Sequence, residues 1–298
     1  MIDYIVFTIF RIFKFLVLLL PKFIMKLFLD GLSYLIYLFN KEHKAYAQAN
    51  LDLVYKDTLS QKEKSSIIRN SYRNLMYNLY EFIENPTLNL EELEKKIHVE
   101  NEEYILDAIA NDRKIILVSA HYGNWEYITS YISLKYKPTT MVGRAMNNEY
   151  FNEDMKNNRN KHNSEMLLKA GSAKGLMKAL KSGRIIGLAT DQHIDPNKGV
   201  IVDFLGHRAS QVDSTARLAV KFNAIIIPVF FIQNDFRNYT VKFDTPIEPS
   251  DFEGENQLLA ITQKEADAMS KQILKKPELW FWQHRRFKEY HKDIYNEQ

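Results

Sequence analysis

The hydrophobic pattern of the chain begins with a long apolar and aromatic run. Residues 4 to 20 read YIVFTIFRIFKFLVLLL, and Arg11 and Lys14 are the charged side chains within this run. A helix of this length reaches ~25 Å, slightly less than the ~30 Å hydrocarbon core of a bilayer, and Pro21 then interrupts the pattern. A secretory signal peptide would place its cations before the apolar run and a small-residue cleavage site after it, so cleavage is not expected.

The charges within and beyond this run suggest a role at a membrane surface. Arg11 and Lys14 share one helical face, and Lys22 and Lys26 repeat the chemistry after the proline. We therefore expect residues 1–40 to form a membrane-anchoring or interfacial helical segment whose cations reach anionic headgroups. The pattern leaves open whether this segment spans the membrane or lies in it. The alternative is a core helix of a soluble protein, which would have to bury large aromatic side chains on every side.

A second periodic segment covers residues 60–84, with Ser60 as a possible N-cap. Its apolar side chains recur at alternating steps of four and three, which predicts a long amphipathic helix with one buried stripe. The stripe consists of Ile68, Tyr72, Leu75, Leu79 and Phe82.

From about residue 98, short β-rich runs alternate with helical segments. This alternation predicts an α/β fold with a mixed central sheet flanked by helices, built by one catalytic domain over residues 41–298. Pro228 interrupts the most apolar of the strands, which predicts an edge strand, a strand end or a bulge there. The candidate strands are residues 114–119, 139–142, 185–190, 224–232 and 239–243, and the candidate helices lie near residues 124–134, 148–169, 174–182 and 214–222.

Composition narrows the classes of function. The chain has 298 residues, of which 46% are hydrophobic and 26% are charged, so neither wholesale disorder nor a many-span membrane protein is indicated. The formal net charge is only +3 and no basic tail is present, so we expect no nucleic-acid partner. The chain contains no cysteine, which excludes disulfides, thiolate metal sites and a cysteine nucleophile.

The candidate chemistry lies in KIILVSAHYGNWEYI, a predicted strand followed by a turn and a helix start. His121 and Glu126 would lie roughly 140° apart on a regular helix, so their cooperation requires a turn at Gly123. Neutral imidazole can take a proton from an acceptor hydroxyl while the carboxylate holds its other ring nitrogen. The backbone amides of Gly123 and Asn124 are tentative oxyanion donors. The spacing alone is weak evidence, because a lone histidine is more often structural.

A metal or cofactor is not expected at this motif. The helical His-Glu-x-x-His pattern of zinc enzymes is missing, and the next histidine after His121 is His162.

Four blocks in order resemble the late acyltransferases of lipid A biosynthesis, which share a His, four residues, Asp or Glu signature. They are AHYGNWE (120–126), GRAMNN (143–148), DQHIDPNKGVIVDFLG (191–206) and PELWFWQHRRFK (277–288). The resemblance covers roughly residues 20 to 290. It implies transfer of a fatty acyl chain, usually from acyl carrier protein, to a hydroxyl of a lipid A precursor. It places that reaction at the cytoplasmic face of the bacterial inner membrane.

The resemblance also assigns residues. His121 and Glu126 fall on the family's catalytic pair, and Arg159 and Asp191 fall on two further site positions. Arg144 matches the arginine of a Tyr-Arg-Pro-like motif, although the next residue is alanine instead of proline. On physical grounds both arginines can give forked hydrogen bonds to a phosphate or an acyl carbonyl, or lie on a solvated helix face. Asp191 follows a predicted strand, where it can orient a base or cap a turn.

A basic and aromatic cluster lies near the C-terminus, in WFWQHRRFK. Arg285 and Arg286 can bind lipid phosphates or the acidic surface of acyl carrier protein. The alternative is structural, with Trp280 and Phe281 packing a terminal helix on the core.

Two other functions remain open from the sequence. One is acyl transfer to another glycolipid or a lysophospholipid. The other is an inactive, membrane-anchored binding or assembly protein, against which the presence of both His121 and Glu126 argues. The motifs do not separate acyl carrier protein from coenzyme A as the donor, and they specify neither the acyl length, nor the acceptor hydroxyl, nor the oligomeric state.

Overall fold

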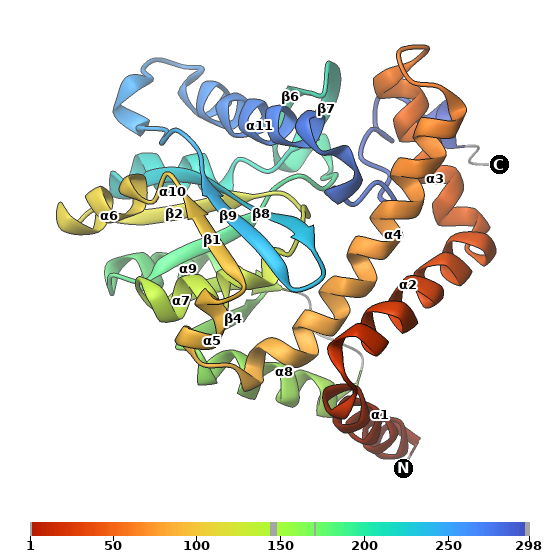
Figure 1. Cartoon of the computed structure of the whole chain (residues 1–298). Coiled ribbons are helices and arrows are strands. Elements are labelled where there is room, and N and C mark those ends of the chain that lie inside the picture. The colour runs from red at the N-terminus through yellow and green to blue at the C-terminus, as the bar shows by residue number, and fades with distance from the viewer. Residues whose placement is uncertain (1, 144–147, 170, 296–298) are drawn as a thin grey trace.

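The computed structural model describes residues 2–143, 148–169 and 171–295 as an α/β domain with a helical N-terminal arm (Figure 1). The arm comprises α1 (Ile2–Leu19), α2 (Lys22–Phe39), α3 (Lys41–Tyr55) and α4 (Gln61–Glu84). Ser60 caps α4 in a reciprocal capping box with Glu63, so the predicted start of this helix is confirmed.

A seven-stranded sheet forms the centre of the domain, in the order β1-β9-β8-β2-β5-β3-β4. β8 and β9 pair antiparallel, and the other neighbours pair in parallel, so the predicted mixed sheet is confirmed. The strands of this sheet are β1 (Ile97–Glu100), β2 (Ile115–Ser119), β3 (Thr139–Gly143), β4 (Ser164–Leu168), β5 (Ile185–Ala189), β8 (Ile225–Asp235) and β9 (Asn238–Phe243), and a separate antiparallel hairpin consists of β6 (Val200–Phe204) and β7 (His207–Gln211).

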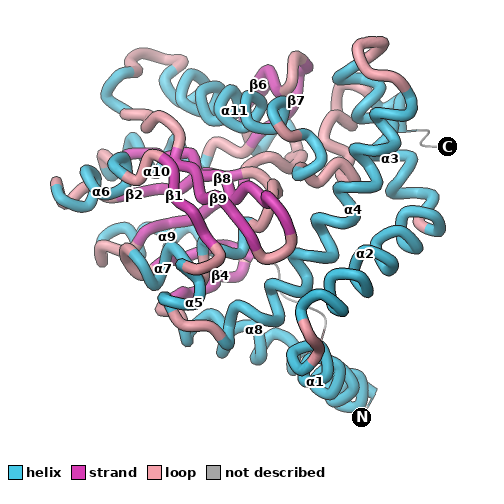
Figure 2. The backbone as a smooth tube through the Cα atoms, viewed as in Figure 1, coloured by secondary structure: helices cyan, strands magenta, loops and turns pink. Residues whose placement is uncertain are grey.

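Helices cover both faces of the sheet (Figure 2). All five residues of β2 are buried, as expected for a central parallel strand. Ile115 and Leu117 face the core formed with α5, α6 and α7, and Ile116 and Val118 face the core formed with α9, α10 and α11. These helices are α5 (Leu90–Glu94), α6 (Glu103–Ala110), α7 (Tyr131–Lys135), α9 (Ser172–Lys181), α10 (Ser214–Phe222) and α11 (Gln257–Lys275).

The N-terminal arm packs on the domain through α4. Met25 and Leu29 of α2 share a buried cluster with Tyr77 and Tyr80 of α4. Pro21 separates α1 from α2, and α1 extends to α8 (Glu149–Lys161), where Phe7 contacts Tyr150 and Phe151 through its ring. None of the described helices is long and apolar enough to cross a membrane by itself; α2 and α3 meet that criterion only as a pair, bent by 85°.

Three local predictions are wrong in part. The helix expected over residues 148–169 ends at Lys161, and the chain continues as the edge strand β4. The helix expected over residues 124–134 is a 3₁₀ turn, η2 (Trp125–Ile128), followed by the short α7. Pro228 lies in the central strand β8, at the point where pairing with β2 ends and pairing with β9 begins, so the edge reading is wrong.

The predicted apolar stripe of α4 is only half correct. Ile68 and Tyr72 are buried, but Leu79 is 46% exposed. In the second half of the helix the buried side chains include Glu81 and Glu84. This difference arises because α4 contacts α2 on one side and the sheet domain on the other.

Candidate active site

The turn after β2 positions the predicted chemistry. Gly123 adopts φ +57°, and a Cβ there would lie 1.5 Å from the carbonyl oxygen of Phe231. Its amide donates to Leu279 O at 2.9 Å, so the turn is held between β8 and the C-terminal segment. Only glycine fits this combination of positive φ and close backbone approach. The predicted turn between His121 and Glu126 is confirmed.

The His121 imidazole is held by Asp191. Nδ1 of His121 lies 2.7 Å from Oδ1 of Asp191, and Nε2 of His121 lies 3.4 Å from the side-chain nitrogen Nε2 of Gln192. The His121 side chain is 24% exposed. A proton on Nδ1 donated to the carboxylate leaves Nε2 as the basic nitrogen. The predicted orienting role of Asp191 at a strand end is therefore supported by its position after β5.

Asp191 is a buried carboxylate with two donors. Its Oδ2 accepts from Nε1 of Trp280 at 2.8 Å. Burial would raise the pKa of Asp191, but His121 and the Trp280 bond outweigh it and lower this pKa to about 2. Burial likewise would lower the pKa of His121, but the Asp191 charge and hydrogen bond, aided by Glu126, raise it above 6.5.

Glu126 takes a different position from the one predicted. The η2 turn places its carboxylate against α8, where both oxygens accept from Nη2 of Arg159 at 3.0 and 3.3 Å. Nδ1 of His121 is bonded to Asp191, so the prediction that Glu126 holds this ring nitrogen is wrong. The charge of Glu126 contributes to the raised pKa of His121, and Arg159 lies beside Glu126. The binding of substrate by Arg159 stays a prediction.

The two tentative oxyanion donors already have protein partners. The amide of Gly123 donates to Leu279 O, and the amide of Asn124 donates to Phe231 O at 3.1 Å. These bonds build the turn, and neither amide can serve an oxyanion without losing its partner. That assignment is corrected.

A small cavity, partly open to solvent, adjoins the Glu126–Arg159 pair. Its walls come from the end of α4, the η2–α7 region and α8. They are lined by Phe82, Asn85, Pro86, Glu126, Thr129, Ser130, Asn158, Arg159 and His162. Among the described residues, no three His, Asp or Glu side chains converge in a way that could hold a metal ion.

Comparison with known proteins assigns the family. The family model for bacterial lipid A biosynthesis acyltransferases matches residues 1–289. The chain belongs to this family. The prediction of an O-acyltransferase of the late lipid A type is thereby confirmed.

Individual relatives are distant but aligned over most of their length. A lipid A biosynthesis acyltransferase of Haemophilus influenzae is 26% identical over 247 residues, which cover 82% of this chain and 77% of the relative. A lipid A biosynthesis palmitoleoyltransferase of Escherichia coli is 25% identical, covering 84% and 80%. A lipid A biosynthesis lauroyltransferase of the same organism is 25% identical, covering 87% and 83%.

Arg286 supports the site of this family member from within the core. It is completely buried, and its guanidinium donates to Gln192 O at 3.0 Å, to Gln211 Oε1 at 3.1 Å and to Ser210 O. Burial lowers the pKa of Arg286 to about 10. The prediction that Arg286 binds substrate is wrong, because these bonds occupy it in joining the β6–β7 hairpin to the Asp191 loop.

The remaining predicted arginines have separate outcomes. Arg285 lies 5.3 Å from the ring centre of Tyr46 on α3. Arg144 falls outside the described residues.

Two contributors were missed at the sequence level. Trp280 packs in the core, as its structural interpretation predicted, but its indole also donates to Asp191, and Gln192 lies next to Nε2 of His121. Gln192 could have been suspected because it directly follows Asp191. Nothing in the local sequence links Trp280 to Asp191 across 89 residues.

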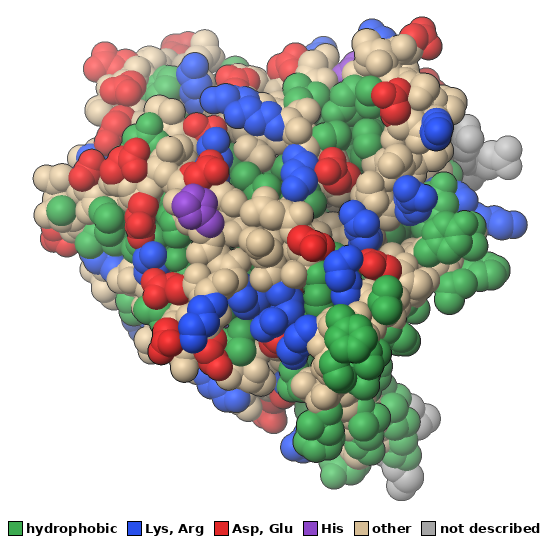
Figure 3. Space-filling view, in the orientation of Figure 1, with side chains coloured by type: hydrophobic (Ala, Val, Ile, Leu, Met, Phe, Trp, Pro, Cys, Tyr) green, Lys and Arg blue, Asp and Glu red, His purple; other side chains and the backbone are tan. Residues whose placement is uncertain are grey.

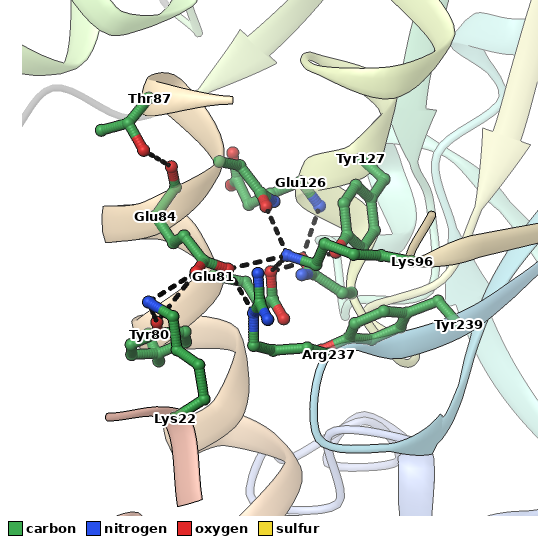
Figure 4. A network of polar contacts seen from close by, with 12 residues as sticks. Lys22, Tyr80, Glu81, Glu84, Thr87, Lys96, Glu126, Tyr127, Arg237 and Tyr239 are labelled. Carbon is green, nitrogen blue, oxygen red and sulfur yellow. Dashed lines mark hydrogen bonds and ion pairs between the residues drawn. The ribbon is translucent and has the colours of Figure 1, made fainter. Parts of the chain in front are cut away.

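A buried ionic network near the site was also missed. Nζ of Lys96, just before β1, contacts Glu81 and lies 2.9 Å from Glu84. Glu84 further accepts from Lys22 of α2 at 3.0 Å and from Arg237 of the β8–β9 turn at 2.8 Å (Figure 4). The network thus joins α2, α4 and the sheet beside Glu126. The paired glutamates on α4, three residues apart, were its only sequence signal.

Proposed function

We propose that this protein transfers a fatty acyl chain from an acyl thioester on acyl carrier protein to a hydroxyl of a lipid A precursor. Family membership supports the lipid A type of acceptor. The observation that carries the mechanism is the 2.7 Å contact between His121 and Asp191, which leaves Nε2 as a base on a partly exposed imidazole.

The reaction needs no nucleophile from the enzyme. His121 Nε2 takes the proton of the acceptor hydroxyl while the hydroxyl oxygen attacks the thioester carbonyl. The new C–O bond forms, the C–S bond breaks, and the imidazolium returns its proton to the departing thiolate. Asp191 stabilises the imidazolium between these steps, as a carboxylate does in a hydrolase triad.

Glu126 and Arg159 act next to this base. In the proposal, Glu126 adds negative charge that favours the imidazolium, consistent with its effect on the pKa of His121. Arg159 is anchored to Glu126 through Nη2, and its Nε, which has no hydrogen-bond partner among the described residues, is placed to donate to a substrate oxygen. We propose Arg144 and Arg285 as further contacts to acceptor phosphates.

The proposed location is the cytoplasmic face of the bacterial inner membrane. Its support is the apolar surface of the N-terminal arm, where large hydrophobic side chains gather over α1 and α2 (Figure 3). Phe15 is 62% exposed, Phe23 is 68% exposed and Leu27 is 67% exposed. Burying such a surface in an interface removes an unfavourable contact with water.

A lipid mass spectrum tests this function. Expression in a host that lacks its own late acyltransferase should add the mass of one acyl chain to lipid A, and His121→Ala should abolish that addition, with a loss of at least ~10³-fold in turnover. Unchanged lipid A alongside a newly acylated glycolipid or phospholipid would move the protein to another acceptor. No new acylated lipid, with folded protein present, would reject the enzyme assignment. Measuring acyl transfer by the purified protein with thioesters of acyl carrier protein and of coenzyme A in turn identifies the donor.

A further inference from the structure

The cavity beside Glu126 carries buried polar atoms without partners. Asn85 and Ser130 are each only 3% exposed. Nδ2 of Asn85, Oγ of Ser130 and Nε of Arg159 have no hydrogen-bond partner among the described residues, and all three side chains line the cavity. Leaving buried polar atoms unpaired is costly, which indicates that something else satisfies them.

The ionic network fixes which end of Asn85 is available. Nζ of Lys96 donates to Oδ1 of Asn85 at 3.2 Å, and Glu81 and Glu84 hold Lys96 in place (Figure 4). The oxygen of Asn85 is therefore occupied and its NH₂ group remains as a donor. Lys96 is a positioning residue for this donor.

The charges around the cavity exclude ionic ligands. Glu126 and Arg159 neutralise each other at 3.0 Å. Burial lowers the pKa of His162, which keeps its ring neutral near pH 7. With no net charge in the lining, a phosphate gains no electrostatic attraction and a cation finds no free carboxylate. Two N–H donors and one hydroxyl instead match a neutral acceptor oxygen.

We propose that this cavity is a subsite for an amide carbonyl of a substrate, bound by Asn85, Ser130 and Arg159. The assignment rests on the proposed acyl transfer, since Glu126 forms one wall and its charge acts on His121. Two substrates supply such a group: the pantetheine arm of the donor thioester, and an N-linked acyl chain of the acceptor glycolipid. Phe82 and Pro86 add apolar walls suited to the carbon atoms that flank an amide.

Steady-state kinetics with purified full-length protein separates the two sources. Ser130→Ala removes one partner, and Asn85→Asp keeps an oxygen for Lys96 while replacing the donor. Each should raise one KM by about two- to tenfold, the effect of one neutral hydrogen bond, with kcat nearly unchanged. If only the KM for the acyl thioester rises, the subsite binds the amide of the donor. If only the KM for the lipid rises, it binds the amide of the acceptor.

The control is Ser71→Ala, which removes a buried hydroxyl that donates to Ile68 O and accepts from Nε2 of Gln283. It should lower the melting temperature without changing either KM. If Ser130→Ala and Asn85→Asp leave both KM values at the wild-type level, the cavity holds only solvent and the subsite is overturned. Absence of transfer by the unsubstituted protein is a distinct result, which rejects the proposed function and the subsite together.

Discussion

Asp191 is fixed beside His121, the proposed base, because both of its oxygens are occupied by donors. Oδ1 faces His121 and Oδ2 faces the Trp280 indole, so the carboxylate cannot rotate away from the imidazole without breaking both bonds. A low pKa of about 2 keeps the Asp191 carboxylate ionised at neutral and mildly acidic pH. The raised pKa of His121 means that its imidazole becomes protonated as the pH falls through a value above 6.5.

The first prediction concerns Asp191→Asn. In the wild type, the acidic limb of kcat/KM against pH should have an apparent pKa above 6.5, because only neutral His121 accepts a proton. The variant loses the charge that raises this pKa, while burial still lowers it, so the limb should move to lower pH. The plateau rate should fall about 10⁴-fold, as when a triad carboxylate is neutralised. A pH–rate profile measures both effects.

Two variants serve as comparisons for this profile. Asp195→Asn makes the same change in an exposed turn and should leave the profile unchanged. Glu126→Gln should slow turnover through displacement of Arg159, but should shift the acidic limb less than Asp191→Asn. If Glu126→Gln shifts the acidic limb more than Asp191→Asn does, Glu126 and not Asp191 orients the His121 imidazole.

At the scale of elements, the geometry of the turn after β2 predicts that Gly123→Ala strongly destabilises the fold. The added Cβ would meet Phe231 O at 1.5 Å, and the backbone has φ +57°. Gly254→Ala is a matched control, with φ +85° and nothing within 4 Å of the new Cβ. We expect about 1–2 kcal/mol of lost unfolding free energy for the control, from the left-handed conformation alone. Gly123→Ala should lose more unfolding free energy than Gly254→Ala and should reduce acyl transfer. Equal losses of unfolding free energy for the two variants in denaturant unfolding would contradict the predicted clash.

The ionic network around Glu84 predicts an acid-sensitive junction between elements. Burial would raise the pKa of Glu84, but Lys96, Arg237 and Lys22 lower it to about 2 from 4.5. Because the pKa of Glu84 is lower in the folded protein than in the unfolded chain, ionised Glu84 adds about 3 kcal/mol to the free energy of unfolding. This contribution is complete above pH 4.5 and is lost as the pH falls towards 2. Buried Glu81, whose pKa is raised, acts in the opposite direction.

Glu84→Gln isolates this contribution. The difference in unfolding free energy between wild type and variant should be largest above pH 4.5 and should shrink on acidification, as measured by urea unfolding at several pH values. Glu91→Gln, at an exposed i,i+4 pair with Lys95, should show little difference at any pH. A pH-independent difference for Glu84→Gln would show that lost packing, not charge, is the cause.

Elements with a strong local pattern were predictable. The capped helix α4 begins within one residue of its expected start, α10 has the expected bounds, and the apolar strands β2 and β5 match closely. β1 and β4 were missed because they are edge strands, IHVE and SEMLL, with polar side chains in short runs. The His121–Asp191 pair could not be derived from spacing, since it joins residues 70 apart.

At the scale of the whole molecule, the apolar arm should govern membrane binding. Ile9 is 61% exposed, Phe15 is 62% exposed and Leu19 is 64% exposed. Replacing all three with Glu should weaken flotation with anionic phospholipid vesicles by at least about tenfold, because each buried apolar side chain contributes ~1.5–3 kcal/mol. The control is Leu274→Glu, at a leucine of α11 that is 50% exposed. This variant should bind the vesicles as the wild type does. Unchanged flotation of the triple variant would assign binding to other surfaces.

The carboxylate shared by His121 and Trp280 has a consequence for the life of the chain before folding is complete. The proposed base, the carboxylate that holds it and the indole that fixes the carboxylate come from positions 121, 191 and 280. A nascent or prematurely terminated polypeptide that lacks the last segment possesses the imidazole but not the lock on Asp191. On the proposed mechanism, catalytic competence requires this last segment, so recovery of turnover during refolding should follow its docking.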